Sequence, residues 1–312
     1  MSTTEIRPIS NRDIPQLCSL WNAHSHAVGI PATLTSQQLE VLVLGKPYFA
    51  MEDLWVVAEP MTGQLLAALL VGPTASVDLS DWDTTSRNVQ WYVDRGRGES
   101  WLGSLLEAAL AQHPPDTRWT VGATAPRAAF ALSDGWCDAM SCWTNSTAAA
   151  TLTALGFRPI DQWQTWHLDL PRFHPPMDRV QLSMRRAVAV ERELEEPRLP
   201  WWLACVLGHA DLYLYRMVSR DDGTPLGDAM VWGVPLEIDA LRDRVWLYPP
   251  PSPTDPGVEA TLTFLLSELA RDLQSQHVIS ISTTVRREDQ SLSKVLSRLG
   301  FQPTSAGTVY AR

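Results

Sequence analysis

Positive charge is scarce in this sequence. Its 312 residues include 25 Lys and Arg against 35 Asp and Glu, which gives a formal net charge of -10. A protein that binds nucleic acid non-specifically needs a basic face to replace the counterions of the phosphates. The composition therefore argues against a nucleic-acid partner. Apolar residues make up 45% of the chain, enough for two domain cores of ordinary size.

Long apolar runs are absent as well. No stretch approaches the roughly 20 apolar residues of a membrane-spanning helix. The first residues, Met1 to Glu5, lack the basic and then apolar segments of a secretory signal. We therefore expect a cytoplasmic protein without a membrane partner.

Cysteine is also rare, and its spacing gives no sign of a metal site. The four cysteines are Cys18, Cys137, Cys142 and Cys205, and they do not form two close pairs with the spacing of zinc ligands. Reduced thiols are expected in a cytoplasmic protein. Tryptophans flank Cys137 and Cys142, which favours a buried apolar cluster over a nucleophilic thiol. We expect no bound metal.

What the chain does contain is one pattern written twice: a strand, a turn, a second strand, a helix and a Leu-Gly-Phe sequence. The strand pairs are expected at 54–59 with 65–71 and at 214–218 with 226–231. The turn glycine precedes a helical Leu-Leu pair by 42 residues in both halves, from Gly63 to Leu105 and from Gly223 to Leu265. The two copies lie 160 residues apart, from Gly63 to Gly223, and this period is too long for a solenoid repeat. It indicates one domain fold used twice.

The two copies also end alike. Leu-Gly-Phe-x-Pro occurs at 155–159 and again at 299–303. Between the copies, the proline-rich segment 171–176 blocks regular structure and marks a boundary. We therefore expect an N-terminal domain over 1–171 and a C-terminal domain over 177–312, packed against each other. Residues 126–143 have no counterpart in the second half and are interpreted as an insertion.

The periodicity predicts a mixed α/β fold. A helix over 99–112 has a stripe of leucines and alanines with helical spacing, and a second helix is expected over 257–274. Residues 89–93 are expected to form a strand, and the polar residues 73–87 a loop. Because a hairpin lies inside each strand-and-helix alternation, we expect a mixed, mostly antiparallel sheet with helices on both faces.

This order of elements resembles that of the GNAT superfamily of acyl-CoA-dependent N-acyltransferases, over nearly the whole chain and twice. Asn145-Ser146-Thr147-Ala148, ahead of the first Leu-Gly-Phe, looks like the start of the last helix of that family. The resemblance implies acetyl-CoA, or a related acyl-CoA, as the acyl donor.

The signature loop of the family usually reads Arg/Gln-x-x-Gly-x-Gly/Ala at the start of a helix, where backbone N–H groups approach the pyrophosphate of coenzyme A. Two registers fit this chain, one over 97–102 and one over 95–100. The alternative is an ordinary exposed turn with two arginines. The residues that the resemblance assigns to the acyl-CoA site are Val93, Arg95, Arg97, Gly98, Glu99, Ser100 and Asn145.

The matching segment of the second half, residues 257–262, has no arginine and follows the stiff proline-rich run 249–253. We interpret this half as structural, or as a wall of the substrate cleft.

Candidate catalytic residues are few. The tyrosine that often protonates the leaving thiolate in this family would fall at Leu152 and Leu296, so a tyrosine acid is not expected. Asp94, after the fourth strand, is the candidate base. His24 and His26 follow the first helix, where this family usually builds its acceptor pocket. A solvated carboxylate and a polar helix-exit loop are the alternatives.

We therefore expect an N-acetyltransferase that transfers an acetyl group from acetyl-CoA to a primary amine of a small molecule. A non-catalytic acyl-CoA-binding sensor is the alternative, favoured by the missing tyrosines and the altered phosphate loops. A scaffold in which neither loop binds a ligand is a third possibility.

Overall fold

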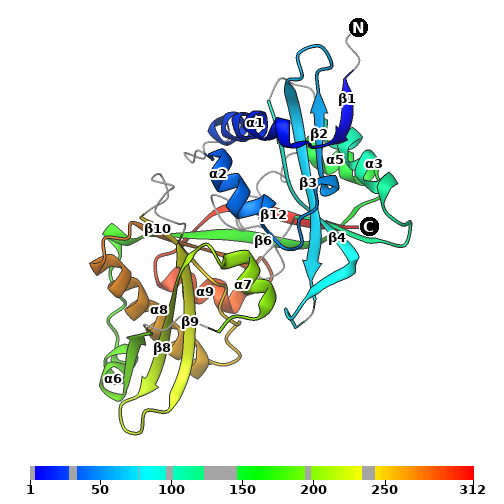
Figure 1. Ribbon diagram of the computed structural model, residues 1–312. Helices are drawn as coiled ribbons and strands as arrows, with labels where there is room; N and C mark the ends of the chain where they lie inside the picture. The colour runs from blue at the N-terminus through cyan, green and yellow to red at the C-terminus, as the bar shows by residue number, and fades with distance from the viewer. Residues whose placement is uncertain are drawn as a thin grey trace. The chain divides into compact units, whose positions relative to one another are not determined.

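The computed structural model describes residues 4–27, 34–76, 78–95, 101–122, 146–193, 198–233 and 243–312, and Figure 1 shows its helices and strands. The chain forms two compact units. The first unit comprises residues 1–161, 199–209 and 307–312, and the second comprises 162–198 and 210–306. The units therefore differ from the sequence halves, because each includes segments that lie in the other half of the sequence.

The first unit is built on a mixed sheet with the strand order β1-β2-β3-β4-β5-β12. Its strands are β1 (Glu5–Pro8), β2 (Leu54–Ala58), β3 (Leu65–Ala75), β4 (Trp82–Asp94), β5 (Arg118–Val121) and the last residues of β12 (Gln302–Ala311). All neighbouring pairs are antiparallel except β4 and β5, which are parallel. This is the mixed, mostly antiparallel sheet that the sequence predicted.

Helices pack on both faces of this sheet. They are α1 (Ile14–Ala27), α2 (Ser36–Leu39) with the π-helical turn η2 (Glu40–Leu44), α3 (Leu102–Gln112), α5 (Ser146–Ala154) and α7 (Trp201–Leu207), with short turns η1 (Asn11–Asp13) and η3 (Met51–Asp53). Trp21 of α1 packs edge to face on Trp91 of β4, with ring centroids 5.0 Å apart. The next strand residue, Tyr92, belongs to the core shared with Leu102 and Leu105 of α3. Successive strand residues point to opposite faces, so α1 and α3 cover opposite faces of the sheet.

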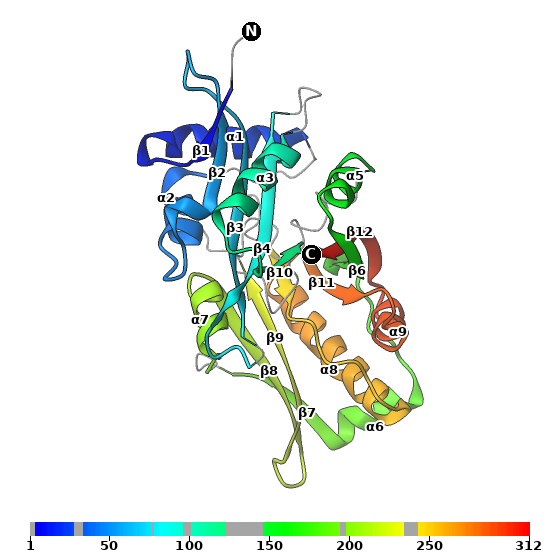
Figure 2. The ribbon, with the colours of Figure 1, turned by 90° about the vertical axis from the view of Figure 1, so that its right-hand side faces the viewer.

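The second unit repeats the plan with the strand order β6-β11-β10-β9-β8-β7. Its strands are β6 (Arg158–Asp169), β7 (Val188–Arg192), β8 (Asp211–Ser219), β9 (Pro225–Gly233), β10 (Arg244–Leu247) and β11 (Ser280–Arg286). Its helices are α6 (Arg179–Ala187), α8 (Pro256–Ser275) and α9 (Gln290–Arg298), with the turn η5 (Leu170–Arg172). Figure 2 shows α8 beside the strands of this unit, and leucines of α8 pack in its core.

The sheet of each unit includes a strand from the opposite half of the sequence. Strand β6, from the first half, pairs with β11 from Asp169–Ser280 to Trp163–Arg286. Strand β12, from the second half, pairs with β5 through Tyr310 and Ala311. Tyr310 is 7% exposed and lies in the core of the first unit. Each core therefore needs residues from both halves of the sequence.

Several expected elements are confirmed, and one is wrong. Helix α8 matches the expected helix over 257–274, and α3 begins at Leu102 within the expected 99–112. The expected loop 73–87 is too long, because β3 continues to Ala75 and β4 begins at Trp82. Its polar residues belong to a paired hairpin, in which Asp83 accepts a 2.7 Å bond from the Arg118 guanidinium.

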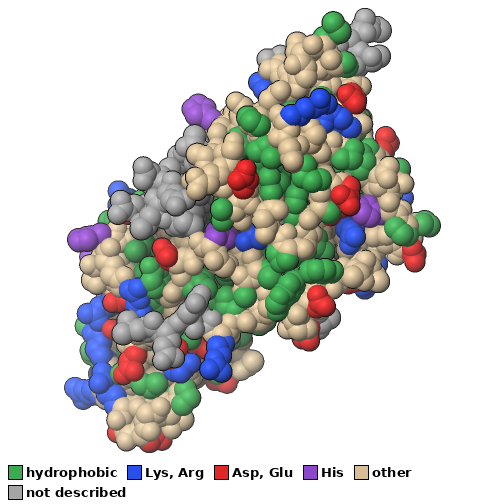
Figure 3. All heavy atoms as spheres, in the orientation of Figure 1, with side chains coloured by type: hydrophobic (Ala, Val, Ile, Leu, Met, Phe, Trp, Pro, Cys, Tyr) green, Lys and Arg blue, Asp and Glu red, His purple; other side chains and the backbone are tan. Residues whose placement is uncertain are grey.

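The second half opens with α6, and β7 follows it from Val188. The insertion expected at 126–143 lies outside the described residues. Within the described ranges, no helix is long and apolar enough to cross a membrane. On the face shown in Figure 3, acidic and basic side chains of the first unit are interspersed.

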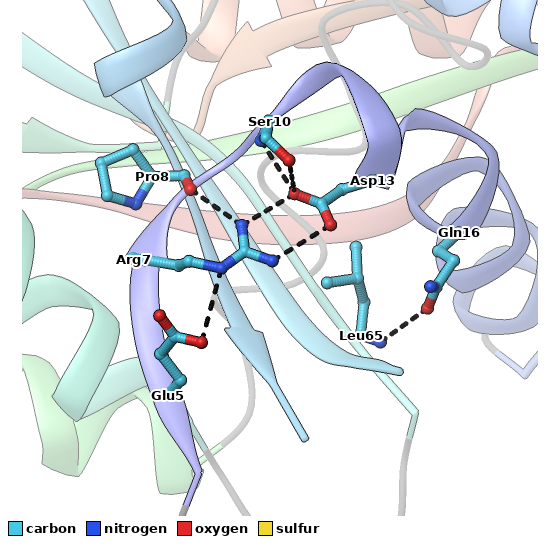
Figure 4. Close-up of polar contacts among 7 residues, drawn as sticks. All are labelled: Glu5, Arg7, Pro8, Ser10, Asp13, Gln16 and Leu65. Carbon is cyan, nitrogen blue, oxygen red and sulfur yellow. Dashed lines mark hydrogen bonds and ion pairs between the residues drawn. The ribbon is translucent and has the colours of Figure 1, made fainter. Parts of the chain in front are cut away.

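The entry into α1 depends on a buried carboxylate (Figure 4). Arg7 of β1 donates two hydrogen bonds to Asp13, at 2.7 and 3.1 Å, and the backbone N–H and hydroxyl of Ser10 donate two more, at 2.8 and 2.6 Å. These donors hold the pKa of Asp13 at about 2, with Arg7 the largest cause. Ser10 and Asp13 thereby form a capping box around the turn η1, which leads directly into α1.

Candidate functional site

Strand β4 has a bulge and then runs on past the end of its pairing with β5. Leu70 of β3 pairs with Trp91, whereas Val71 pairs with Val89, so Gln90 is the extra residue of the bulge. The pairing of β4 with β5 ends at Val89 and Val121. Beyond this point β4 continues as a strand to Asp94. The candidate base therefore lies at the end of a strand that has left its parallel neighbour.

Two of the expected acyl-CoA residues are placed at this strand end. Val93 is buried and pairs with Ala68 of β3. Arg95 follows the strand, and its backbone N–H donates to Leu66 O at 3.2 Å while its Nε donates to Leu65 O at 2.8 Å. These bonds fix the backbone immediately before the expected loop.

The structure brings the two expected residues Asp94 and His24 together. Nδ1 of His24 lies 3.3 Å from both the backbone N and the backbone O of Asp94, and 3.7 Å from its Oδ1. Both side chains are about one-fifth exposed, at 16% and 21%. His26 is exposed further along α1. The end of α1 and the end of β4 thus form one polar group of side chains.

Asp94 is also contacted by a residue that the sequence did not single out. The Tyr92 hydroxyl donates to Oδ2 of Asp94 at 2.8 Å and accepts a bond from the backbone N–H of Trp101 at 3.1 Å. Trp101 is the N-cap residue of α3. The chain of contacts His24–Asp94–Tyr92–Trp101 therefore links α1, β4 and the start of α3. Tyr92 belongs to no motif, so no sequence signal identified it.

The start of α3 follows the segment in which the sequence predicts the phosphate-binding loop. Trp101 makes no side-chain cap, so among the described residues no side chain caps the first turn of α3. Gly103 allows close packing on α5, because a Cβ there would lie 3.3 Å from Cγ2 of Thr151. The helix begins at Leu102, the last residue of the 97–102 register. The loop residues Arg97, Gly98, Glu99 and Ser100, together with Asn145, lie outside the described residues.

The corresponding helix start in the second unit is already occupied by a carboxylate. Asp255 caps α8, and its Oδ1 accepts bonds from Gly257 N at 2.8 Å and Val258 N at 3.1 Å. One residue further, Glu259 adds another negative charge, paired with Lys294 at 3.0 Å. A phosphate would compete with Asp255 for the same amides and meet two carboxylates.

Buried leucines occupy both positions at which the family often has a tyrosine. Leu152 of α5 and Leu296 of α9 are each 0% exposed, within the cores of their units. Among the described residues, no group of three or more His, Cys, Asp and Glu side chains is arranged to hold a metal ion.

Known proteins resemble this chain in fold, although not closely in sequence. No protein-family profile and no curated protein sequence matches it. A GCN5-related N-acetyltransferase from Sphaerobacter thermophilus superposes with a TM-score of 0.61 at 14% identity, covering 99% of this chain and 95% of that one. A tandem GNAT protein from the clavulanic acid biosynthesis pathway gives a TM-score of 0.61 at 16% identity, covering 99% and 98%.

A third similar structure belongs to a larger protein. It contains a GCN5-related glucosamine N-acetyltransferase region of a fungal multi-domain GH3 β-N-acetylglucosaminidase, with a TM-score of 0.67 at 14% identity. All of this chain is covered, but it spans only 38% of that protein. Two of these matches cover nearly the full length of both chains, and one of them is a tandem GNAT protein. The protein therefore has the GNAT fold twice in one chain.

Proposed function

We propose that the protein is an N-acyltransferase that transfers the acyl group of an acyl-CoA, acetyl-CoA in the simplest case, to a primary amine of a small molecule. The observation that carries the proposal is the end of β4. A bulged strand leaves its parallel partner there, carries Asp94 beside His24, and leads into a helix whose first turn no described side chain caps.

In this proposal the first unit binds the donor. Arg97, Gly98, Glu99 and Ser100 form the loop that holds the pyrophosphate, and the N-terminal amides of α3 add the positive end of a helix dipole. Val93 and Arg95 supply the adjoining backbone. Asn145, before α5, completes the donor site.

The reaction needs one proton acceptor. The amine nitrogen attacks the thioester carbon, the new C–N bond forms, and the C–S bond then breaks to release coenzyme A as the thiolate. The proton lost by the amine passes to the Asp94–His24 pair, directly or through a water. In the tautomer whose Nδ1–H donates to the backbone oxygen of Asp94, at 3.3 Å, the basic nitrogen of His24 is Nε2.

A single titration tests donor binding and its location. Acetyl-CoA is titrated into the wild type, Arg97→Ala and Glu259→Ala. Arg97→Ala should lose a charge-assisted phosphate contact worth about 1.5–3 kcal/mol, which weakens binding roughly tenfold to a hundredfold. Glu259→Ala, at the matching helix of the second unit, should bind like the wild type. Loss in Glu259→Ala with no change in Arg97→Ala would place the donor in the other unit.

The base is tested by three matched substitutions in an assay of amine acylation over a panel of primary amines. Asp94→Asn and His24→Asn should each lower kcat by about 10²–10⁴-fold, the usual contribution of a general base. His26→Asn, an exposed histidine on the same helix, should leave kcat unchanged. Equal kcat in all three variants and the wild type would exclude this pair as the base.

One observation favours a second candidate function, a non-catalytic acyl-CoA sensor. The buried Leu152 and Leu296 leave no tyrosine acid at either expected position. A thiolate leaves without an acid, so the leucines do not exclude catalysis. Tight acetyl-CoA binding without acylation of any amine in the panel would establish the sensor instead.

A further inference from the structure

The hydroxyl of Tyr92 bonds to two described residues in the interior of the first unit. Its ring is 8% exposed and packs in the core with the α3 leucines. The hydroxyl donates to Oδ2 of Asp94 at 2.8 Å and accepts from the backbone N–H of Trp101 at 3.1 Å. A phenylalanine ring would fill the same space, so the hydroxyl serves these two bonds rather than the packing.

The two partners belong to different parts of the proposed site. Trp101 follows the loop residues 97–100, to which the donor pyrophosphate is assigned, and caps α3. Asp94 faces His24 through its other carboxylate oxygen, Oδ1, at 3.7 Å. With Oδ2 held by Tyr92, the carboxylate is oriented with Oδ1 toward the imidazole.

We propose that Tyr92 is a positioning residue for acyl transfer. Its hydroxyl holds the Asp94 carboxylate against His24 and ties it to the backbone amide of Trp101, the N-cap residue of α3, so that the base and the start of α3 keep a fixed geometry relative to each other. This inference rests on the proposed function. Because the carboxylate remains about one-fifth exposed, it has room to turn toward solvent once the bond from Tyr92 is lost.

The kinetic test separates positioning from packing. Tyr92→Phe should lower kcat for amine acylation about tenfold, the effect of one hydrogen bond to a charged group, while the KM for acetyl-CoA changes less than about threefold. The double variant Tyr92→Phe/Asp94→Asn should be no slower than Asp94→Asn alone, because Tyr92 acts through Asp94. Tyr310→Phe, which alters another tyrosine of the same core, is the control and should leave kcat unchanged.

A second measurement needs no substrate. Hydrogen exchange of the Trp101 amide, followed by NMR with 15N-tryptophan labelling, should be faster in Tyr92→Phe than in the wild type or Tyr310→Phe. Unchanged exchange, unchanged kcat, or multiplicative losses in the double variant would each overturn the role of Tyr92. If the wild type neither binds acetyl-CoA nor acylates an amine, the proposed function fails, and the catalytic role of Tyr92 fails with it. In that case the exchange rate still reports whether the hydroxyl holds the start of α3.

Discussion

The two units follow one plan but differ at the helix that would meet the donor phosphates. In the second unit, Asp255 accepts bonds from two amides at the start of α8, and Glu259 lies in the same turn. In the first unit, no described side chain caps α3, and two arginines lie in the sequence that leads to it. The helix start of the second unit is therefore self-capped, whereas the proposed function assigns the helix start of the first unit to the donor phosphates.

Two aspartates at strand starts, one in each unit, differ in burial. Asp53, immediately before β2, is 8% exposed, whereas Asp211, the first residue of β8, is exposed. Burial, the largest cause, raises the pKa of Asp53 to about 6, while the nearby Arg87 acts in the opposite direction. The ionised carboxylate of Asp53 therefore costs the first unit stability.

The largest predicted effect concerns the strand that the second half of the sequence contributes to the first unit. Tyr310→Ala removes a core side chain that the last strand of the chain supplies to the first unit. We expect a loss of about 3–5 kcal/mol in the free energy of unfolding, measured by chemical denaturation. Ser305→Ala, an exposed position on the same strand, should change it by less than about 0.5 kcal/mol.

The same exchange predicts how the whole chain unfolds. Because each unit needs a strand from the other half, the full chain should melt in a single transition, and separate halves divided at Pro175 should be poorly soluble. Two resolved transitions, each reproduced by an isolated soluble half, would show that the units are independent.

The next largest effect on stability concerns the buried carboxylate of Asp53 in the first unit. The pKa of Asp53 is raised in the folded state, so its contribution to stability decreases as the pH rises from about 4 through 6. Asp53→Asn should therefore stabilise the protein by about 1–3 kcal/mol at pH 8 and by little at pH 4. Asp211→Asn, at an exposed aspartate, is the control and should change the stability by less than about 0.5 kcal/mol. A loss of stability in Asp53→Asn at pH 8 would contradict this account.

The smallest effect concerns the cap that fills the second unit's helix start. Asp255→Ala leaves two amides of α8 without their acceptor and should cost about 1 kcal/mol of folding free energy. Asp255→Ser keeps an acceptor without the charge and should cost only a few tenths. Equal stability of the alanine variant and the wild type, measured by denaturation, would show that the cap is dispensable.

Local patterns in the sequence predicted much of this fold. The repeated glycine-to-leucine spacing and the two Leu-Gly-Phe endings predicted that one domain fold occurs twice, because turn and helix signals are local. The exchange of β6 and β12 was not predictable, since strand pairing across the chain leaves no local signal. The loop expected at 73–87 was predicted too long. Side chains such as Asp83 and Thr85 are polar, which favoured a loop, but the backbone there is paired in a hairpin.

The candidate site was predictable only in part. Asp94 and His24 were named separately, and their proximity depends on how α1 lies on the sheet. Tyr92 escaped notice because a tyrosine within an apolar strand is ordinarily a core residue, and its hydroxyl partners become visible only in three dimensions.

The central claim, that one unit binds the donor and the other does not, is tested most directly by the stoichiometry of acetyl-CoA binding. Isothermal titration calorimetry of the wild-type chain should give one site per chain, with that site weakened in Arg97→Ala and unaffected in Asp255→Ser. Two sites of similar affinity per chain, or a single site that survives Arg97→Ala and responds to Asp255→Ser, would contradict the account.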